Sequence, residues 1–578
     1  MTTDTRAVHD VADRSREQER RVLDVVLKTF YARRSVTATF TGIHDHDHEL
    51  PDFSPEAMQS ARGELSALRR ALAGAGLGVL HAEEIRQRDW LAIDGALADS
   101  VLELELAEDQ SSHFARGNPS IALGEALFSI VALAGAHDDD STEARVEAAV
   151  SRLRAFPAFL HGARRTLGEG DLPAAWRARA MRECEGGMLL LADLSGWPVA
   201  GGVPVSLCRE LQDAAGHASA ALEWFRAYLA ARPEAPETRY AAGHWMLALL
   251  VRRGHWCDLT IERLRHEARA ALERETSHLG DVLRGEAWHA VSSRLAATHP
   301  DSDDVLHAAR AAWRECRELS SGELTWPDAP LPYVATPAWA RRAAPMLYYL
   351  PYRSPAPFGS SIGRYDVLCP DPTDAAGQDA FSRLWNRAAI KLNHVAHHGG
   401  LGHHVQNWHA RRSPSRIGQV AAVDAACRIA MFCGGSMAEG WACYATEIME
   451  SLGFLTPDER IAAQHTRVRL MARAVVDLEL HTGRMTFGEA VRFHVDAAHL
   501  TTGAAHAEVT KCSMFPGTAM MYWLGLRDLW RIRAAEEAAR GGTFSARAFH
   551  DEVLSFGSMP VPLIARLMTS RRTPGTPA

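Results

Sequence analysis

A dense group of histidines is the part of this sequence best suited to chemistry. Between positions 394 and 409 lie six of them: His394, His397, His398, His403, His404 and His409. The chain has 28 histidines in 578 residues, so an even distribution would place about one in this segment. Histidine is the commonest metal ligand and a common acid or base near neutral pH. The group therefore predicts a metal site.

The spacing leaves several ligand pairs open. On a straight α-helix, residues four or seven positions apart share a face. His394 and His398 meet this condition, and so do His397 and His404. Either pair could therefore bind one metal ion from a single helix.

A third pair needs an interrupted helix. His397 and His403 are six positions apart, which is about 240° around a straight helix. They could reach the same ion only if the helix is bulged or broken between them. The intervening Gly-Gly-Leu-Gly segment, 399–402, permits such a break.

A further ligand is expected on another element, and Glu439 is the best candidate. It lies in an apolar segment of small residues, 434–447, where an unpaired buried carboxylate would be costly. A neighbouring metal ion would remove that cost. The alternative is a solvated glutamate at a helix end.

Composition and charge limit the classes of protein. The chain is 47% hydrophobic and carries 63 basic against 71 acidic residues, which indicates a globular protein without a nucleic-acid partner. Residues 1–21 are polar and do not resemble a signal peptide, and the longest apolar window, 120–136, is too short to span a membrane. The nine cysteines are scattered. We therefore expect a cytoplasmic protein without a membrane partner.

Most of the chain has helical patterns. Ser54 before Pro55 is an N-cap signal, and apolar residues then recur at three- and four-residue steps up to Gly74. Capping boxes at Thr456 and Thr486 begin two more helices, the first running to about His481.

The middle of the chain differs. Prolines are frequent in 326–373, and runs of β-type residues at 348–350 and 365–368 predict short strands. We therefore divide the chain into a helical half (1–325), this irregular segment and a second helical half (374–578). The predicted fold is a mainly α, large helical body with a small β-containing segment lining a central cleft.

The two chemical segments together resemble a bacterial family known as "domain of unknown function 885". Segment 397–406, His-His-Gly-Gly-Leu-Gly-His-His-Val-Gln, resembles its motif His-Glu-x-x-Pro-Gly-His-His-x-Gln, and segment 439–444 matches its Glu-Gly-Trp-Ala-x-Tyr motif in full. That family in turn resembles helical zinc metallopeptidases of the thimet-oligopeptidase, angiotensin-converting-enzyme and carboxypeptidase Taq type. Three further stretches agree with family motifs in the same order: 41–54, 476–481 and 516–527.

The resemblance implies a ligand set. In the related peptidases the second histidine ligand follows a glycine, which selects His397 and His403 as the pair. Glu439 would be the third ligand of a Zn²⁺ ion and a water molecule the fourth. His404 and His394 are the fallback ligands.

The sequence departs from the family motif at its catalytic position. The family has a glutamate after the first histidine, the expected general base, and this chain has His398. A neutral imidazole, with a pKa of about 6.5, can also act as a base. His398 is therefore a substitute base, an additional metal ligand or a relic of a lost activity.

Several other residues have weaker signals. By the same resemblance, Tyr522 either donates a hydrogen bond to a developing oxyanion or is a structural tyrosine. Asp477 and His481, four apart on one helix, either orient a metal ligand or form an ordinary helix pair. Gln406 of the first motif is likewise expected to lie behind the metal ligands and orient them. The polar run 44–49 is most simply a solvated loop.

Three functions remain as expectations. The first is a metal-dependent hydrolase of a small amide, peptide or acyl conjugate, with His398 as the base. The second is a non-hydrolytic enzyme of specialised, biosynthetic metabolism that holds Fe²⁺ or another redox metal on the same scaffold, because two histidines and a carboxylate also bind non-haem iron. The third is a binding protein without catalytic activity.

Overall fold

The computed structural model describes most of the chain. Within it the protein is mainly α-helical with one small sheet, as predicted. The expected strand at 348–350 lies outside the described residues. The described residues are 3–135, 141–199, 202–328, 330–347, 351–359, 363–370, 374–420 and 434–570.

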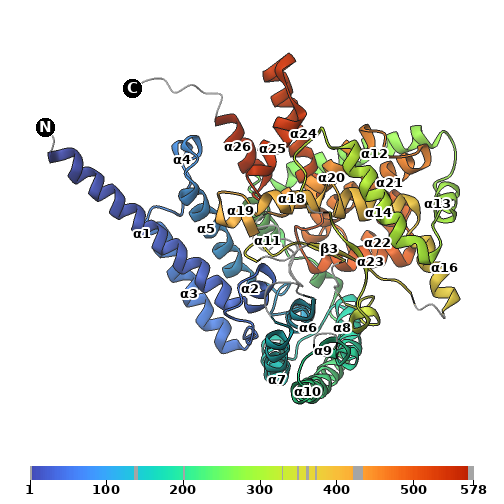
Figure 1. Cartoon of the computed structure of the whole chain (residues 1–578), viewed down its shortest axis with the longest axis horizontal. Coiled ribbons are helices and arrows are strands. Elements are labelled where there is room, and N and C mark those ends of the chain that lie inside the picture. Colours follow the sequence, from blue (N-terminus) through green and yellow to red (C-terminus); the bar gives the residue numbers. More distant parts are fainter. Residues whose placement is uncertain are drawn as a thin grey trace.

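The first half of the chain contains the helices that the sequence pattern predicts. Ser54 caps its helix by accepting a hydrogen bond from the Ala57 N–H, and Pro55 is the first helical residue. Figure 1 shows the long first helix, α1, running beside α3. Helices α5 and α6 are almost entirely buried. The elements are α1 (Thr3–Arg33), α2 (Ser35–Thr41), α3 (Pro55–Gly74), α4 (Ala82–Gln87), α5 (Trp90–Glu108), α6 (Pro119–Gly135), α7 (Thr142–Leu167), α8 (Ala174–Asp193), α9 (Gly196–Val199), α10 (Val205–Ala230), α11 (His244–Leu249), α12 (Ile261–Leu283), α13 (Trp288–Ala297) and α14 (Val305–Leu319).

The proline-rich segment contains the sheet. Its strands are β1 (Tyr333–Ala335), β2 (Tyr352–Arg353) and β3 (Arg364–Val367), in the order β1-β3-β2, and a short helix, α15 (Ala338–Arg341), follows β1. Strand β3 is parallel to β1 and antiparallel to β2. The register aligns Tyr333, Tyr365 and Tyr352 in one row across the sheet. Because side chains alternate along a strand, these tyrosines share one face.

The second half is again helical. The predicted capping boxes at Thr456 and Thr486 are both present, and the helix that begins after Thr456 ends at His481. The elements are α16 (Ala375–Leu384), α17 (Arg387–Ala389), a π-helix η4 (Ile390–Gly399), α18 (His403–Ala410), α19 (Arg416–Val420), α20 (Gly435–Ser451), α21 (Pro457–His481), α22 (Phe487–Ala498), α23 (Thr502–Met514), α24 (Met521–Arg540), α25 (Ala546–Ser555) and α26 (Val561–Thr569).

Packing joins the three segments. One apolar cluster includes Leu97 of the first half, Tyr365 of the sheet and Trp441 of the second half. Helices α20 and α24 approach at Gly440 and Gly525, where a side chain on either glycine would overlap the other helix. In the described part of the chain, no helix combines the length and apolar character needed to cross a membrane.

Candidate metal centre

The histidine segment is wound as a π-helix that ends in a break. In η4 the hydrogen bonds join residues five positions apart, as in the 2.7 Å bond from the Gly400 N–H to the Val395 carbonyl. After the glycine segment, α18 begins at His403. A π-turn contains more residues than an α-turn, so neighbouring side chains are separated by a smaller angle. Both the bulge and the break considered for His397 and His403 are therefore present.

Two tryptophans from other helices hold the break in place. The indole N–H of Trp313, on α14, donates to the Gly399 carbonyl at 2.8 Å. The indole N–H of Trp441, on α20, donates to the Leu401 carbonyl at 3.0 Å. These bonds satisfy carbonyls that the interrupted helix leaves unpaired. Trp441 of the Glu-Gly-Trp-Ala-x-Tyr motif thus connects the helix carrying Glu439 to the histidine segment.

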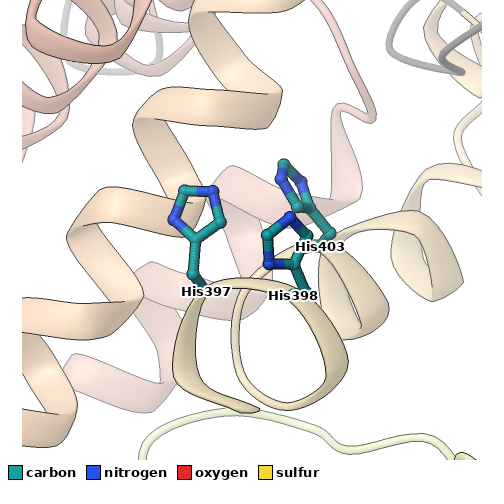
Figure 2. Close-up of side chains that lie close together, drawn as sticks. All are labelled: His397, His398 and His403. Atoms are coloured by element: carbon teal, nitrogen blue, oxygen red, sulfur yellow. The ribbon is translucent and has the colours of Figure 1, made fainter. Parts of the chain in front are cut away.

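Three histidines converge on one point. Each of His397, His398 and His403 offers a ring nitrogen that lies within 4.8 Å of the other two. Figure 2 shows the three rings gathered beside the π-turn and the start of α18. The Glu439 carboxylate joins them from α20: its Oε2 is 3.2 Å from His397 Nε2 and 3.5 Å from His403 Nε2. These side chains are partly open to solvent, at 16% for His397 and 13% for His403.

The donor set fits a transition-metal ion. Two ligands of a tetrahedral zinc ion, each about 2.0–2.1 Å from it, lie about 3.3 Å apart. The two distances from Glu439 to the imidazoles, 3.2 and 3.5 Å, are close to that spacing. Two imidazoles and a carboxylate are ligands that zinc, iron and related ions accept.

The protonation states also suit metal binding. Burial raises the pKa of Glu439, but the charges and hydrogen bonds of His403 and His397 outweigh it and hold the pKa well below its ordinary value. Burial lowers the pKa of His397. The site therefore offers an ionised carboxylate, which is the form that binds metals.

His398 has a fixed orientation. Its Nδ1 lies 2.7 Å from the Asn393 carbonyl oxygen and must donate to it. The proton is thus on Nδ1, and Nε2 carries a lone pair. Burial, together with repulsion from His397 and His403, lowers the pKa of His398 well below 6.5. Its imidazole is consequently neutral at neutral pH.

The two fallback ligands make other contacts. His394 stacks on Trp385 with ring centroids 3.7 Å apart, and its Nδ1 lies 2.7 Å from the Tyr365 hydroxyl. His404 is buried with its ring edge-on to Tyr352, and neither ring nitrogen has a hydrogen-bond partner among the described residues. The structure therefore brings together His397 and His403, the pair that the resemblance selects.

Asp477 and His481 bond backbone groups near α24 and in α23 rather than the histidine cluster. The Asp477 carboxylate accepts hydrogen bonds from the N–H groups of Gly517 (2.9 Å) and Met520 (2.8 Å), directly before α24. Burial raises its pKa to about 7. His481 Nε2 lies 3.0 Å from the Cys512 carbonyl oxygen. Asp477 thus positions the start of α24, which carries Tyr522, and His481 contacts the last turn of α23.

We expect Asp477→Asn to lower the free energy of unfolding by about 1–3 kcal/mol, because the amide NH₂ cannot accept and leaves one buried N–H unpaired. Denaturant unfolding of the variant against the wild type measures this change. Asp496→Asn is the control, since Asp496 is exposed on α22. Equal midpoints for the wild type and Asp477→Asn would contradict this role.

Gln406 and the polar run 44–49 are also structural. The Gln406 amide donates to the Ser558 hydroxyl at 2.6 Å, so it connects α18 to the segment before α26. In the polar run, His44 Nδ1 lies 2.8 Å from the Asp47 carboxylate. The fully buried Arg152 donates to the Glu49 carbonyl at 3.0 Å and fixes the loop. The solvated-loop interpretation missed this buried anchor.

Arg473 is a residue that the sequence interpretation missed. Its guanidinium carbon lies 5.5 Å from the centroid of the Tyr522 ring, and its charge interacts with Glu439. Tyr522 is thus linked to the centre through Arg473. A signal was present in the sequence, because polar residues recur every fourth position along the otherwise buried α21: His465, Arg469, Arg473, Asp477 and His481.

Fold and site together define a mainly helical protein with a partly buried cluster of three histidines and one carboxylate. The chain belongs to a bacterial family of proteins of unknown function, DUF885, whose model matches residues 36–568. No curated protein matches the chain.

Two solved structures share the fold. One is described as "a putative lipoprotein of unknown function from Shewanella oneidensis"; it is 18% identical, with a TM-score of 0.71, over 95% of this chain and 99% of that one. The other, "the putative lipoprotein from Colwellia psychrerythraea", is 16% identical, with a TM-score of 0.74, over 96% of this chain and 98% of that one.

These descriptions contradict the expected cytoplasmic localisation, which was wrong. The expectation depended on the polar residues 1–21 and on the scattered cysteines. In the described part of the chain seven cysteines are free, and most of them are buried. A buried free cysteine packs as a small apolar side chain, so it does not report the compartment.

Proposed function

We propose that this protein is a metal-dependent hydrolase whose centre consists of His397, His403 and Glu439. The observation that carries the proposal is the position of Glu439 Oε2, 3.2 Å and 3.5 Å from the two imidazoles and therefore at the spacing of metal ligands. The resemblance to helical zinc peptidases supports zinc as the metal. The substrate class is a small amide, peptide or acyl conjugate.

Each side chain has a role in this proposal. A zinc ion supplies a Lewis acid that polarises a carbonyl group and makes a water molecule more acidic. Because Nδ1 of His398 donates to the Asn393 carbonyl, its Nε2 is free to accept the proton of the attacking water. Tyr522, held against Arg473, would donate a hydrogen bond to the developing oxyanion.

The same hydrogen bond favours a second candidate. Ligating histidines nearly always donate their other ring N–H to a carbonyl or carboxylate, as His398 does to Asn393. His398 would then be an additional ligand beside His397 and His403. A site with three imidazoles and a carboxylate also suits Fe²⁺ and redox chemistry.

We expect His398→Ala to retain the metal and to lose hydrolytic activity by about 10²–10⁴-fold, the usual contribution of a general base. The assay is turnover of N-acyl p-nitroanilides and p-nitrophenyl esters, with metal content measured on the same samples. His289→Ala, at an exposed histidine of α13, should leave both unchanged. Loss of the metal in His398→Ala would instead support the additional-ligand role.

A further inference from the structure

Two arginines beside the centre carry more positive charge than their partner neutralises. Arg469 and Arg473 are four residues apart on α21 and therefore share a face. Both bond Glu508 of α23: Arg469 Nε lies 3.1 Å from Oε1, and Arg473 Nε lies 2.7 Å from Oε2. In the described part of the chain, Glu508 is the one carboxylate within 4 Å of either guanidinium. Two cations thus share one anion.

Glu439 also attracts the charge of Arg473, but it faces His397 and His403 and forms no ion pair with Arg473 among the described residues. Repulsion from Arg473 is the main reason that the pKa of Arg469 is lowered. Tyr522 of α24 contributes an aromatic ring against Arg473. His494 of α22 also interacts with this group, and burial keeps it neutral by lowering its pKa to about 4. Both His494 ring nitrogens lack a hydrogen-bond partner among the described residues, although the side chain is fully buried.

The arginine pair lies next to the histidine cluster. Arg473 lies against Tyr522 of α24, with 5.5 Å between the guanidinium carbon and the ring centroid. One turn after Tyr522, Gly525 of α24 packs against Gly440 of α20, the residue that follows Glu439. The charge of Arg473 acts on Glu439 and on His397.

The pair is also open to solvent. The side chain of Arg469 is 39% exposed and that of Arg473 is 19% exposed, so a solute can reach them. A guanidinium pairs well with carboxylates through paired N–H groups. An excess of one positive charge matches one carboxylate.

We propose that Arg473 and Arg469 bind a carboxylate group of the substrate beside the His397–His403–Glu439 centre. The substrate would then be an amide or acyl conjugate that carries a free carboxylate near the cleaved bond. This inference rests on the proposed hydrolase, because it assigns the bound carboxylate to the substrate of that enzyme. The anion site itself can be tested by binding alone.

The test is calorimetric binding of N-benzoylglycine and of its uncharged amide to the full chain, before and after removal of metal with a chelator. We expect the acid to bind at least about tenfold more tightly than the amide, because a charged group gains charge-assisted hydrogen bonds. Arg473→Gln should abolish this preference. Arg467→Gln is the control, since Arg467 already has Glu450, Glu447 and Glu275 as partners.

Glu508→Gln provides an independent test should Arg473→Gln fail to fold. It removes the competing carboxylate and should tighten binding of the acid. Equal affinity for acid and amide in the wild type, including no binding of either, overturns the proposal, and so does tighter binding of inorganic phosphate than of the acid. A chain that holds no metal but prefers the acid would refute the hydrolase and retain the anion site. A metal-loaded hydrolase without a preference for the acid would refute the anion site and retain the hydrolase.

Discussion

Replacing Glu439 by glutamine should lower the affinity for zinc by more than about 100-fold. Changing groups that merely orient metal ligands already costs about 10–100-fold, and Glu439 is placed as a ligand. Its Oε2 lies 3.2 Å from His397 Nε2, and a neutral amide cannot supply the negative charge that the site offers the ion. Titration of the metal-free protein with zinc against a competing chelator measures the change.

Glu447→Gln is the matched control for that experiment. Glu447 lies on the same helix, α20, but bonds the Trp530 indole N–H at 2.5 Å instead of the histidines. We expect its zinc affinity to equal that of the wild type. Wild-type affinity in Glu439→Gln would remove Glu439 from the ligand set.

Replacing Gly402 by alanine should disrupt both the break and the centre. An added Cβ would overlap the carbonyl oxygen of His397, a backbone atom that cannot move without displacing that histidine. We expect the free energy of unfolding to fall by at least about 3 kcal/mol, the upper end of overpacking costs. Zinc affinity should fall with it. Chemical denaturation and zinc titration measure the two effects.

Gly216→Ala separates this clash from a general effect of glycine replacement. Gly216 is exposed on α10, and an added Cβ would meet no atom within 4 Å. Alanine is a better helix former than glycine by about 0.5–1 kcal/mol, so this variant should be as stable as the wild type or more stable. If Gly402→Ala proved equally stable and bound zinc normally, the close contact with His397 would be irrelevant to the site.

Local signals predicted much of the fold. The N-cap at Ser54 and the capping boxes at Thr456 and Thr486 all begin helices where expected, because a side-chain acceptor at a helix start acts within a few residues. The strand at 365–368 is present as β3. The pairing of β3 with β1 was not predictable, because it joins strands that are distant in the sequence.

The site was less predictable. Straight-helix geometry allowed His394 with His398 and His397 with His404, but the π-turn changes the angles, and His394 instead stacks on Trp385. The ligand pair His397 and His403 came from the family resemblance rather than from spacing. Hydrogen bonds from distant tryptophans fix the break, and a local pattern does not reveal such contacts.

The metal content of the wild-type protein tests the central claim most directly. Protein purified without added metal and without chelators should contain about one zinc or iron ion per chain by plasma mass spectrometry. His397→Ala, treated identically, should contain none. A wild-type protein that holds no transition metal, and that takes up neither zinc nor iron when titrated, would contradict the account.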